Sequence, residues 1–453
     1  MIRAELGHLL RLAAPIILTQ LSQMGMGVAD TIMAGRYGAV DLAGVALGGN
    51  VFWPTVMLMA GVIMAIVPTV SQLHGGGKQA EGGEVVRQAA WIALAAGVLL
   101  ILVYQNAVVV YQLIGVDPLA VPIAVGYLDA LSWATLPLLG YFALRYLCEG
   151  MSWALPAMLV AFVGLLVKIP LNYLFIYGGA GIPAMGGVGC GWASVVVIWL
   201  EFLILALVVM RSRMRVTGLF ARFSWPDGRR IWRLLKLGLP IGLTGFLEFS
   251  MFSIVTLLIG RLGVEVVAAH QIATSVGGLA FMIPMALGIA VAIRVGFNVG
   301  TGDLAAARRS GWVAIGVSLA FAVVAGTALF AARGFIAGLY SNELVVITLA
   351  MELLVFVAVY QLVDDSQVTA LGALRGFKDT RTPMMIALMA YWTVGLPVGV
   401  ALGFGWVVVP GFEGVRGFWV GLTAGLAVAS VVLIGRFSWL STRAGHIRRL
   451  AHR

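Results

Sequence analysis

The chain repeats a short motif: Leu-Ala-Ala-Pro-Ile-Ile-Leu-Thr at residues 12–19 recurs as Leu-Gly-Leu-Pro-Ile-Gly-Leu-Thr at residues 237–244. The ends of the same two segments also match, since Thr-Ile-Met-Ala-Gly-Arg-Tyr-Gly (31–38) recurs as Thr-Leu-Leu-Ile-Gly-Arg-Leu-Gly (256–263). The later matches are Pro156 with Pro383, Pro170 with Pro397 and Trp192 with Trp419. Ordered matches of Pro, Arg and Trp are hard to obtain by chance, so the sequence predicts a duplicated architecture.

The composition places this duplicated chain in a membrane. Of its 453 residues, 61% are hydrophobic and only 11% are charged, and its mean hydropathy is +1.02. A soluble domain carries about 25% charged residues, so a water-soluble fold of this size could not cover its surface. Soluble enzymes, disordered chains and fibrous proteins are therefore excluded, and we predict a polytopic membrane protein.

Apolar runs between Gly, Pro and charge clusters predict the crossings, because each crossing needs about 20 apolar residues. The predicted fold is all-α, with twelve transmembrane helices in two pseudo-symmetric six-helix lobes. The expected spans are 9–34, 43–73, 88–112, 120–146, 153–177, 188–210, 232–260, 266–295, 310–338, 345–373, 383–406 and 415–437. The expected domains are an N-terminal lobe (1–215), a cytoplasmic basic linker (216–231) and a C-terminal lobe (232–453).

The basic residues predict the orientation of these helices. Lys and Arg collect in the cytoplasmic loops of membrane proteins. This bias explains why the chain has 29 basic but only 19 acidic residues. Because the excess of basic residues needs no other explanation, we expect no nucleic-acid partner. The predicted spans place 24 basic residues, Arg145 among them, on the side of the two termini and four on the other side. We therefore expect both termini in the cytoplasm.

The duplication also suggests a mechanism. Six spans per half mean that both halves enter the membrane from the same side, as in the parallel repeats of secondary transporters. Rocking one bundle against the other alternates access to a site between them. The chain has no Walker A loop, no GxSxG or HExxH motif and no Cys cluster. We predict a secondary transporter rather than an enzyme, driven by an ion gradient or by a partner subunit.

Ionisable side chains inside the predicted spans are candidate functional residues, because a charge at mid-bilayer costs about 2.5–3.5 kcal/mol or more. Asp30 lies late in the first span, on one helical face with Gln20, Gln23 and Gly27. We predict a functional carboxylate at Asp30. The alternative is a carboxylate near the outer interface that pairs with Arg36.

Glu248 lies in the middle of the seventh predicted span. Its neighbours along the chain include Phe246, Phe249 and Phe252. Burial among aromatic rings disfavours the charged form of a carboxyl group. A carboxyl that exchanges a proton or a bound cation suits ion coupling, and we predict that role for Glu248.

Two adjacent acids, Asp364 and Asp365, lie in the middle of the tenth predicted span. The residues on the helical face of Asp364 are Tyr360, Gln361 and Gln367. Asp365 points about 100° away from that face. Two neighbouring carboxylates cannot both ionise cheaply in a low dielectric, so we predict that they share a proton or hold a cation. The alternative is an internal pair bound to Arg375 or Lys378.

Three further residues, Asp129, Lys168 and Glu201, carry weaker predictions. Lys168 is the only basic residue deep in a predicted span, and it could neutralise a carboxylate. Glu201 could satisfy a neighbouring helix.

Several motifs together resemble the multidrug and toxic compound extrusion (MATE) family, most closely its bacterial NorM branch. They are Leu-Ala-Ala-Pro-Ile (12–16), Gly-Val-Ala-Asp-Thr-Ile-Met-Ala-Gly-Arg (27–36), Leu-Ile-Gly-Arg-Leu-Gly (258–263), Ala-Ala-His-Gln-Ile (268–272) and Gly-Ala-Leu-Arg-Gly-Phe-Lys-Asp-Thr-Arg-Thr-Pro (372–383). Each motif is weak alone, but the combination is specific and covers nearly the whole chain.

The resemblance implies an antiporter of the bacterial inner membrane that exports amphipathic, often cationic, drugs against inflow of Na⁺ or H⁺. We expect a monomer with no cofactor besides the coupling ion. By position, Asp30 matches the carboxylate of the N-terminal lobe. Glu248 and Asp364 match the cation site of the C-terminal lobe and would hold the metal if the ion is sodium. Its expected neighbours are Phe252, Phe281, Tyr360 and Gln367, and the expected drug contacts near the outer mouth are Gln23, Gln271, Asn342 and Glu343.

The sequence departs from the family pattern at two places. Asp365 adds a carboxylate where relatives usually carry a small residue, which leaves the ion and its stoichiometry open. Asn342 and Glu343 stand where some relatives have paired aspartates, which leaves the drug preference open. Two other functions stay possible: a flippase for a lipid-linked precursor, as in the wider superfamily, and a channel or membrane-embedded enzyme.

Overall fold

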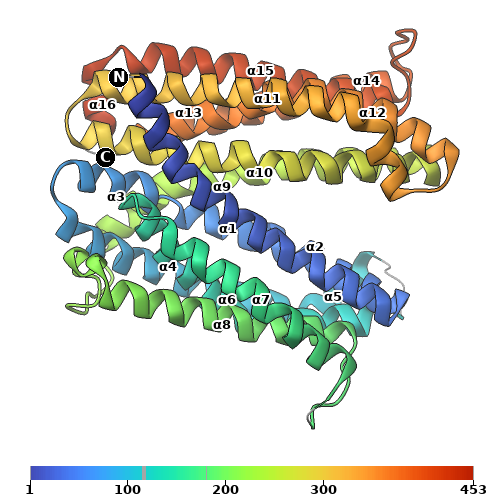
Figure 1. Ribbon diagram of the computed structural model, residues 1–453, viewed down its shortest axis with the longest axis horizontal. Coiled ribbons are helices and arrows are strands. Elements are labelled where there is room, and N and C mark those ends of the chain that lie inside the picture. Colours follow the sequence, from blue (N-terminus) through green and yellow to red (C-terminus); the bar gives the residue numbers. More distant parts are fainter. Residues whose placement is uncertain (1, 115–118, 180, 452–453) are drawn as a thin grey trace. The chain divides into compact units, whose positions relative to one another are not determined.

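The computed structural model describes residues 2–114, 119–179 and 181–451, which fold almost entirely into helices (Figure 1). The helices of the first half are α1 (Ile2–Tyr37), α2 (Ala39–Ile63), α3 (Ile66–Gly75), α4 (Gln79–Gln105), α5 (Ala107–Ile114), α6 (Val121–Gly150), α7 (Leu155–Tyr177) and α8 (Gly187–Arg211). Those of the second half are α9 (Gly228–Ile259), α10 (Val264–Gly300), α11 (Leu304–Tyr340), α12 (Leu344–Gly376), α13 (Arg381–Met389), α14 (Leu396–Gly403), α15 (Val415–Ser441) and α16 (Ala444–Ala451).

Twelve of the helical segments in the described ranges are long and apolar enough to cross a membrane, which confirms the predicted twelve spans. Two of these segments are broken. The helices α2 and α3 form one span with a turn at Met64, and a π-helix (Ala390–Gly395) joins α13 to α14. Each break lies four residues before a proline, Pro68 or Pro397. A proline ring clashes with the carbonyl of the fourth preceding residue, which weakens the helix at both breaks. Proline alone does not break a helix here, since α1, α6 and α10 continue through Pro15, Pro137 and Pro284.

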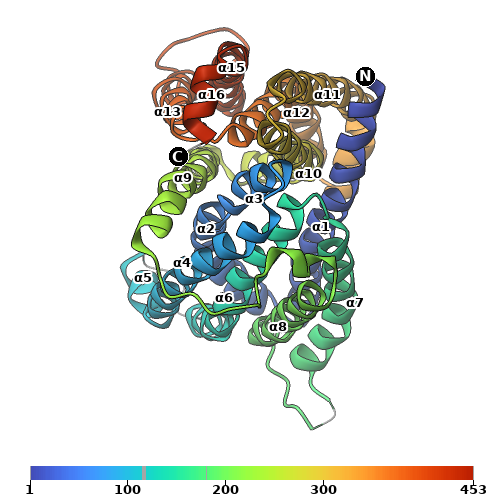
Figure 2. The ribbon, with the colours of Figure 1, turned by 90° about the vertical axis from the view of Figure 1, so that its left-hand side faces the viewer.

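The chain divides into two compact units, Ala14–Gly242 and Met1–Ala13 with Leu243–Arg453. In the first unit, α6 contacts α2, α4 and α8; in the second, α12 contacts α10, α11 and α15 (Figure 2). Both α6 and α12 contain the fourth span of their half, so the internal duplication extends to the packing. The boundaries of these two units fall inside α1 and α9. The predicted domain limits 1–215, 216–231 and 232–453 stay a prediction.

An ion pair explains why the first residues of α1 group with the second half. The guanidinium of Arg294 in α10 donates to both carboxylate oxygens of Glu5, at 3.0 and 2.8 Å. Ser310 in α11 donates to Glu5 at 2.7 Å. Glu5 and Ser310 are buried. These bonds fix the start of α1 to α10 and α11.

The predicted basic linker is fixed to the first unit. Arg87 in α4 donates to the carbonyl oxygens of Gly218 and Leu219 at 2.6 and 2.8 Å, and to the Ser224 hydroxyl at 2.9 Å. Glu84, one helical turn before Arg87, accepts from Ser224 at 2.8 Å. The linker therefore follows the surface of the first unit instead of extending freely.

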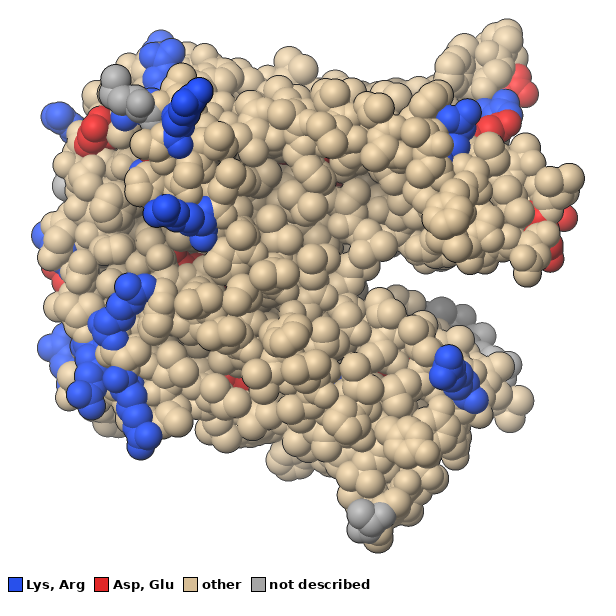
Figure 3. Space-filling model, viewed as in Figure 1, with Lys and Arg blue, Asp and Glu red and all other residues tan. Residues whose placement is uncertain are grey.

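Lys and Arg side chains gather at helix ends, and the apolar middles of the helices show almost none in the view of Figure 3. Arg145 is an exception that corrects the count above. It lies inside α6 and is buried, so it is not a charge in a cytoplasmic loop. The sequence suggested a loop position because the apolar run ends at about this residue. The orientation of the termini stays a prediction.

Glycines allow α14 and the π-helix to lie directly against α15. A Cβ atom added at Gly421 in α15 would overlap the backbone of Gly399, and one added at Gly425 would lie 2.9 Å from the Cα of Gly395. Small residues at such contacts let helix backbones approach closely, which is a main source of association between helices in membranes.

Replacing Gly421 by Val is therefore expected to destabilise the protein by about 1–3 kcal/mol, the usual cost of overpacking. Gly435 is the matched control, because it lies in the same helix and has open space around it. The thermal unfolding midpoint of each purified variant measures the effect. Equal midpoints for Gly421→Val and Gly435→Val would show that α15 can move away from α14 at little cost.

Candidate ion-binding sites

Three of the predicted acids lie together in the second unit. Asp364 and Asp365 on α12 are 4% and 0% exposed, and Glu248 on α9 is half-buried. The charge of Glu248 acts directly on Asp364, as does that of Asp365. Their proximity was expected from the resemblance, whereas sequence spacing alone could not join α9 to α12.

Tyr391 completes this group and was missed by the sequence analysis. It lies in the π-helix and is fully buried. Its hydroxyl accepts a hydrogen bond from the amide nitrogen of Gln367, and it also contacts the carboxyl of Glu248. π-Helical segments are frequent at functional sites. The only sequence signal for this segment was Gly395 followed closely by Pro397.

Six buried polar atoms of Asp364, Asp365 and two neighbouring glutamines lack a hydrogen-bond partner in the described part of the chain. Among the described residues, they are Asp364 Oδ1, Asp365 Oδ1 and Oδ2, Gln361 Oε1 and Nε2, and Gln367 Oε1. Gln361 lies beside Asp365, but its amide does not reach hydrogen-bond geometry. A buried acceptor without a partner costs about 1–3 kcal/mol. All five orphaned oxygens belong to residues 361–367 of α12, so a proton or a small cation bound at this part of the helix would stabilise them.

The acids near Asp364 do not by themselves form a complete set of metal ligands. Within the described ranges, no three His, Cys, Asp or Glu side chains are placed to hold a metal ion. A metal would instead combine two carboxylates with amide oxygens, the hard oxygen donors that such cations prefer. The sodium ligands predicted at Glu248 and Asp364 stay a prediction.

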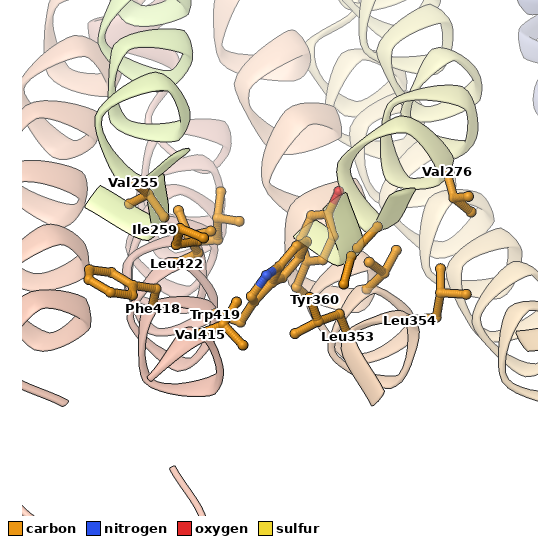
Figure 4. Close-up of a cluster of buried hydrophobic side chains, with 14 of the residues drawn as sticks. Val255, Ile259, Val276, Leu353, Leu354, Tyr360, Val415, Phe418, Trp419 and Leu422 are labelled. Atoms are coloured by element: carbon orange, nitrogen blue, oxygen red, sulfur yellow. The ribbon is translucent and has the colours of Figure 1, made fainter. Parts of the chain in front are cut away.

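A buried hydrophobic cluster of the second unit contains the rings of Tyr360, Phe418 and Trp419 (Figure 4). Tyr360 links this cluster to the acids, because the charges of Asp364 and Asp365 act on it. Tyr360 packs on Trp419 with a ring-centroid distance of 5.9 Å, and His270 packs on the same indole at 5.6 Å. Phe252 packs against this buried cluster. Phe281, also predicted beside the cation, is half-buried on α10.

The predicted drug contacts do not belong to this group of acids. Gln271, Asn342 and Glu343 are exposed, the first near the start of α10 and the other two in the turn between α11 and α12. Gln23 belongs to the first unit, where its side chain accepts from Arg145 at 3.2 Å.

Asp30, the fourth predicted coupling residue, forms a separate site in the first unit. Its carboxylate is 3.0 Å from the ammonium of Lys168 and accepts from Asn172 at 2.7 Å. Lys168 also donates to the carbonyl oxygen of Cys190 at 3.0 Å and to the hydroxyl of Ser194. The partner of Asp30 is therefore Lys168 on α7 and not Arg36.

A second ion pair lies deeper in the same unit. Arg145 donates to Glu149, one turn further along α6, at 2.7 Å. It also donates to Gln20 at 2.9 Å and to Gln23 at 3.2 Å. The polar face predicted on α1 therefore supplies hydrogen-bond acceptors to Arg145. Both side chains are almost inaccessible to solvent, since Arg145 is 3% and Glu149 is 1% exposed.

The two remaining acids, Asp129 and Glu201, differ in their burial. Asp129 is exposed on α6. Glu201 is buried in the middle of α8, and its Oε1 has no hydrogen-bond partner in the part of the chain that the structure describes. The charges of Arg145 and Lys168 act on it.

A family model and individual relatives both match this chain along nearly its whole length. The MatE family model matches residues 15–174 and again residues 240–401, one match in each half. The chain is 42% identical over 452 residues to "Multidrug resistance protein MdtK" of Yersinia pseudotuberculosis serotype O:1b (strain IP 31758), covering 99% of both proteins. It is 41% identical over 452 residues to the protein of the same name from Yersinia enterocolitica serotype O:8, again with 99% of both covered.

Solved structures share the fold at low sequence identity. A eukaryotic MATE transporter, AtDTX14, superposes with a TM-score of 0.90 at 23% identity, covering 100% of this chain and 99% of that one. An outward-facing multidrug resistance MATE family transporter of the MOP superfamily gives 0.87 at 19% identity, covering 98% and 96%.

Proposed function

This chain belongs to the MatE family of multidrug and toxic compound extrusion transporters, and we propose that it is a cation-coupled antiporter that exports amphipathic, often cationic, compounds. The names of its relatives support multidrug export. The duplicated architecture supports alternating access by two similar bundles. We place it in the bacterial inner membrane as a monomer with both termini in the cytoplasm.

The orphaned oxygens around Asp364 and Asp365 carry the proposal of ion coupling. In the outward-facing state, Na⁺ or H⁺ binds among Glu248, Asp364 and Asp365, and this binding favours release of the drug. In the inward-facing state the ion leaves and the drug binds again. The coupling can only be as large as the difference in ion affinity between the two states.

The proposed drug contacts of the second unit are the exposed Gln271, Asn342 and Glu343, and the proposed drug contact of the first unit is Gln23. Amide and carboxylate groups recognise a cationic drug weakly and without strict geometry. The chain also has 19 Met and 13 Trp residues, whose flexible and flat side chains suit binding of varied ligands.

Efflux from proteoliposomes tests the function and identifies the ion. Purified protein should export ethidium or norfloxacin under an inward gradient of either Na⁺ or H⁺, and not under the other alone. The control is the same preparation with both gradients collapsed, where net export should stop. Turnover stimulated by a lipid-linked precursor but not by drugs would instead identify a flippase. Single-channel currents, or turnover without a gradient, would identify a channel or an enzyme.

A further inference from the structure

Exposed aromatic rings gather in the linker that follows α8 and at the start of α9. Four such side chains lie within residues 220–233: Phe220 (52% exposed), Phe223 (69%), Trp225 (78%) and Trp232 (61%). The rings of Phe223 and Trp225 are in contact, with a centroid distance of 5.3 Å. Single exposed apolar residues are ordinary, whereas a group of them marks an interaction site. The ion exchange proposed above uses none of these residues.

The aromatic part of the linker is held in one place by α4. The Gln88 side chain donates to the carbonyl oxygen of Trp225 at 3.0 Å and accepts from the backbone nitrogen of Asp227 at 2.8 Å. One turn earlier in α4, a Cβ atom added at Gly83 would lie 2.3 Å from the carbonyl oxygen of Thr217, so the two backbones are in direct contact. These contacts involve the backbone of the linker and therefore do not depend on its aromatic side chains.

The rings lie where α4 changes from polar to apolar. The charged residues of this helix all fall within residues 79–87, and none follows before its end at Gln105. Trp91 lies in the first apolar turn. Its ring packs on Phe223 with a centroid distance of 6.1 Å, and its indole nitrogen donates to the carbonyl oxygen of Ser224 at 3.1 Å. In a membrane-spanning helix this transition marks the level of the lipid headgroups, where Trp rings are enriched.

The same region carries a large positive charge. Residues 211–236 contain eight Lys or Arg residues and one acid, Asp227. At the start of α9, Arg229, Arg233 and Lys236 are exposed and share one helical face, because they are spaced four and three residues apart. The nearby acids Asp227 and Glu84 pair with other arginines. The exposed face of α9 therefore attracts anions.

We propose that residues 220–236, which we call the aromatic–basic segment, bind anionic phospholipids. The aromatic rings lie among the headgroups, and the guanidinium groups of Arg229 and Arg233 bind lipid phosphate, which arginine recognises with two parallel hydrogen bonds. A zwitterionic lipid offers the same phosphate but also a positive group, so the positive charge of the segment selects lipids with a net negative charge. Clusters of four to eight basic residues beside a membrane-spanning helix are typical of such recognition.

An acidic protein is the alternative occupant of this surface. The position of the rings beside the first apolar turn of α4 favours the lipid, because a membrane already covers that level of the helix. The proposal concerns a surface away from the buried acids, so it does not depend on the proposed antiport function.

Native mass spectrometry of the purified full chain in detergent tests the charge. Phosphatidylglycerol and phosphatidylcholine are titrated in equal amounts, and the concentration of each lipid at half occupancy is measured. Wild type should retain phosphatidylglycerol in preference. Each basic residue near an anionic lipid surface contributes about fivefold to binding, so Arg229→Gln/Arg233→Gln should weaken binding of phosphatidylglycerol about 20- to 30-fold. Arg308→Gln/Arg448→Gln is the control, because it removes the same charge from exposed positions elsewhere and should leave this binding unchanged.

The aromatic rings are tested separately. Phe223→Ser/Trp225→Ser keeps every charge and every backbone contact of the linker with α4, and it should also weaken binding of phosphatidylglycerol. Trp406→Ser is the control, because this side chain is 74% exposed in the loop after α14. Size-exclusion profiles must agree for all variants.

Three results would overturn the proposal. Equal retention of the two lipids by wild type would show that charge does not select the lipid. Unchanged binding of phosphatidylglycerol in either double variant of the segment would leave the surface to a protein partner. Displacement of the lipid by an equal concentration of inorganic phosphate would indicate a site for the free ion. These measurements need neither drug nor gradient, so a failure of drug export would refute the proposed function separately.

Discussion

Glu248→Gln is expected to reduce gradient-driven drug export to the level of empty liposomes. Glutamine has nearly the shape of a protonated glutamate, so the contact with Tyr391 and the packing of α9 should survive. What is lost is the change of charge. Coupling between two ligands is typically about 1–3 kcal/mol, or about 5–150-fold in affinity. A site that no longer binds the ion cannot supply this difference, and drug then only equilibrates.

The measurement is the ratio of ethidium inside to outside at steady state under the driving gradient. Glu265→Gln is the matched control, since it removes an exposed acid from a neighbouring helix and should leave the ratio unchanged. Size-exclusion profiles must agree for all variants. If Glu248→Gln maintains the wild-type ratio at equal expression, the coupling ion binds elsewhere.

The fold was predictable from sequence because bilayer thickness fixes the length of an apolar run. The ends of the helices were not. The third span was expected at 88–112, yet α4 covers Gln79–Gln105 and a separate helix, α5, follows at Ala107–Ile114. The first turns of α4 carry Glu84, Arg87 and Gln88, which bind the linker. Such polar turns extend a helix beyond its apolar run, and a hydropathy profile therefore does not predict where the helix begins.

The candidate sites were predictable only one helix at a time. Helical periodicity placed Gln361 and Gln367 on the face of Asp364, but it could not show that Tyr391 from another helix meets that face. The same limit applies to the pair of Asp30 and Lys168, which lie far apart in the sequence. The sequence suggested that Lys168 could neutralise some carboxylate, and only the packing of α1 against α7 identifies which one.

Arg145→Met is expected to lower the free energy of unfolding by about 3–5 kcal/mol, the usual cost of breaking a buried ion pair by removing one partner. The loss leaves Glu149 charged at 0% exposure, with its second oxygen already without a hydrogen-bond partner. It also removes the donors that Gln20 and Gln23 accept from. Denaturant titration in mixed micelles measures the change.

Two comparisons separate the buried charge from a general effect of losing an arginine. The double variant Arg145→Met/Glu149→Gln should recover most of the lost stability, because no unpaired charge then stays in the interior. Arg416→Met is the surface control: Arg416 and Glu352 pair at 2.6 Å but are 41% and 40% exposed, and such pairs contribute about 0–1 kcal/mol. If Arg145→Met were no more costly than Arg416→Met, water would have to reach Glu149, and the buried pair would be no more sensitive to the loss of one partner than the surface pair.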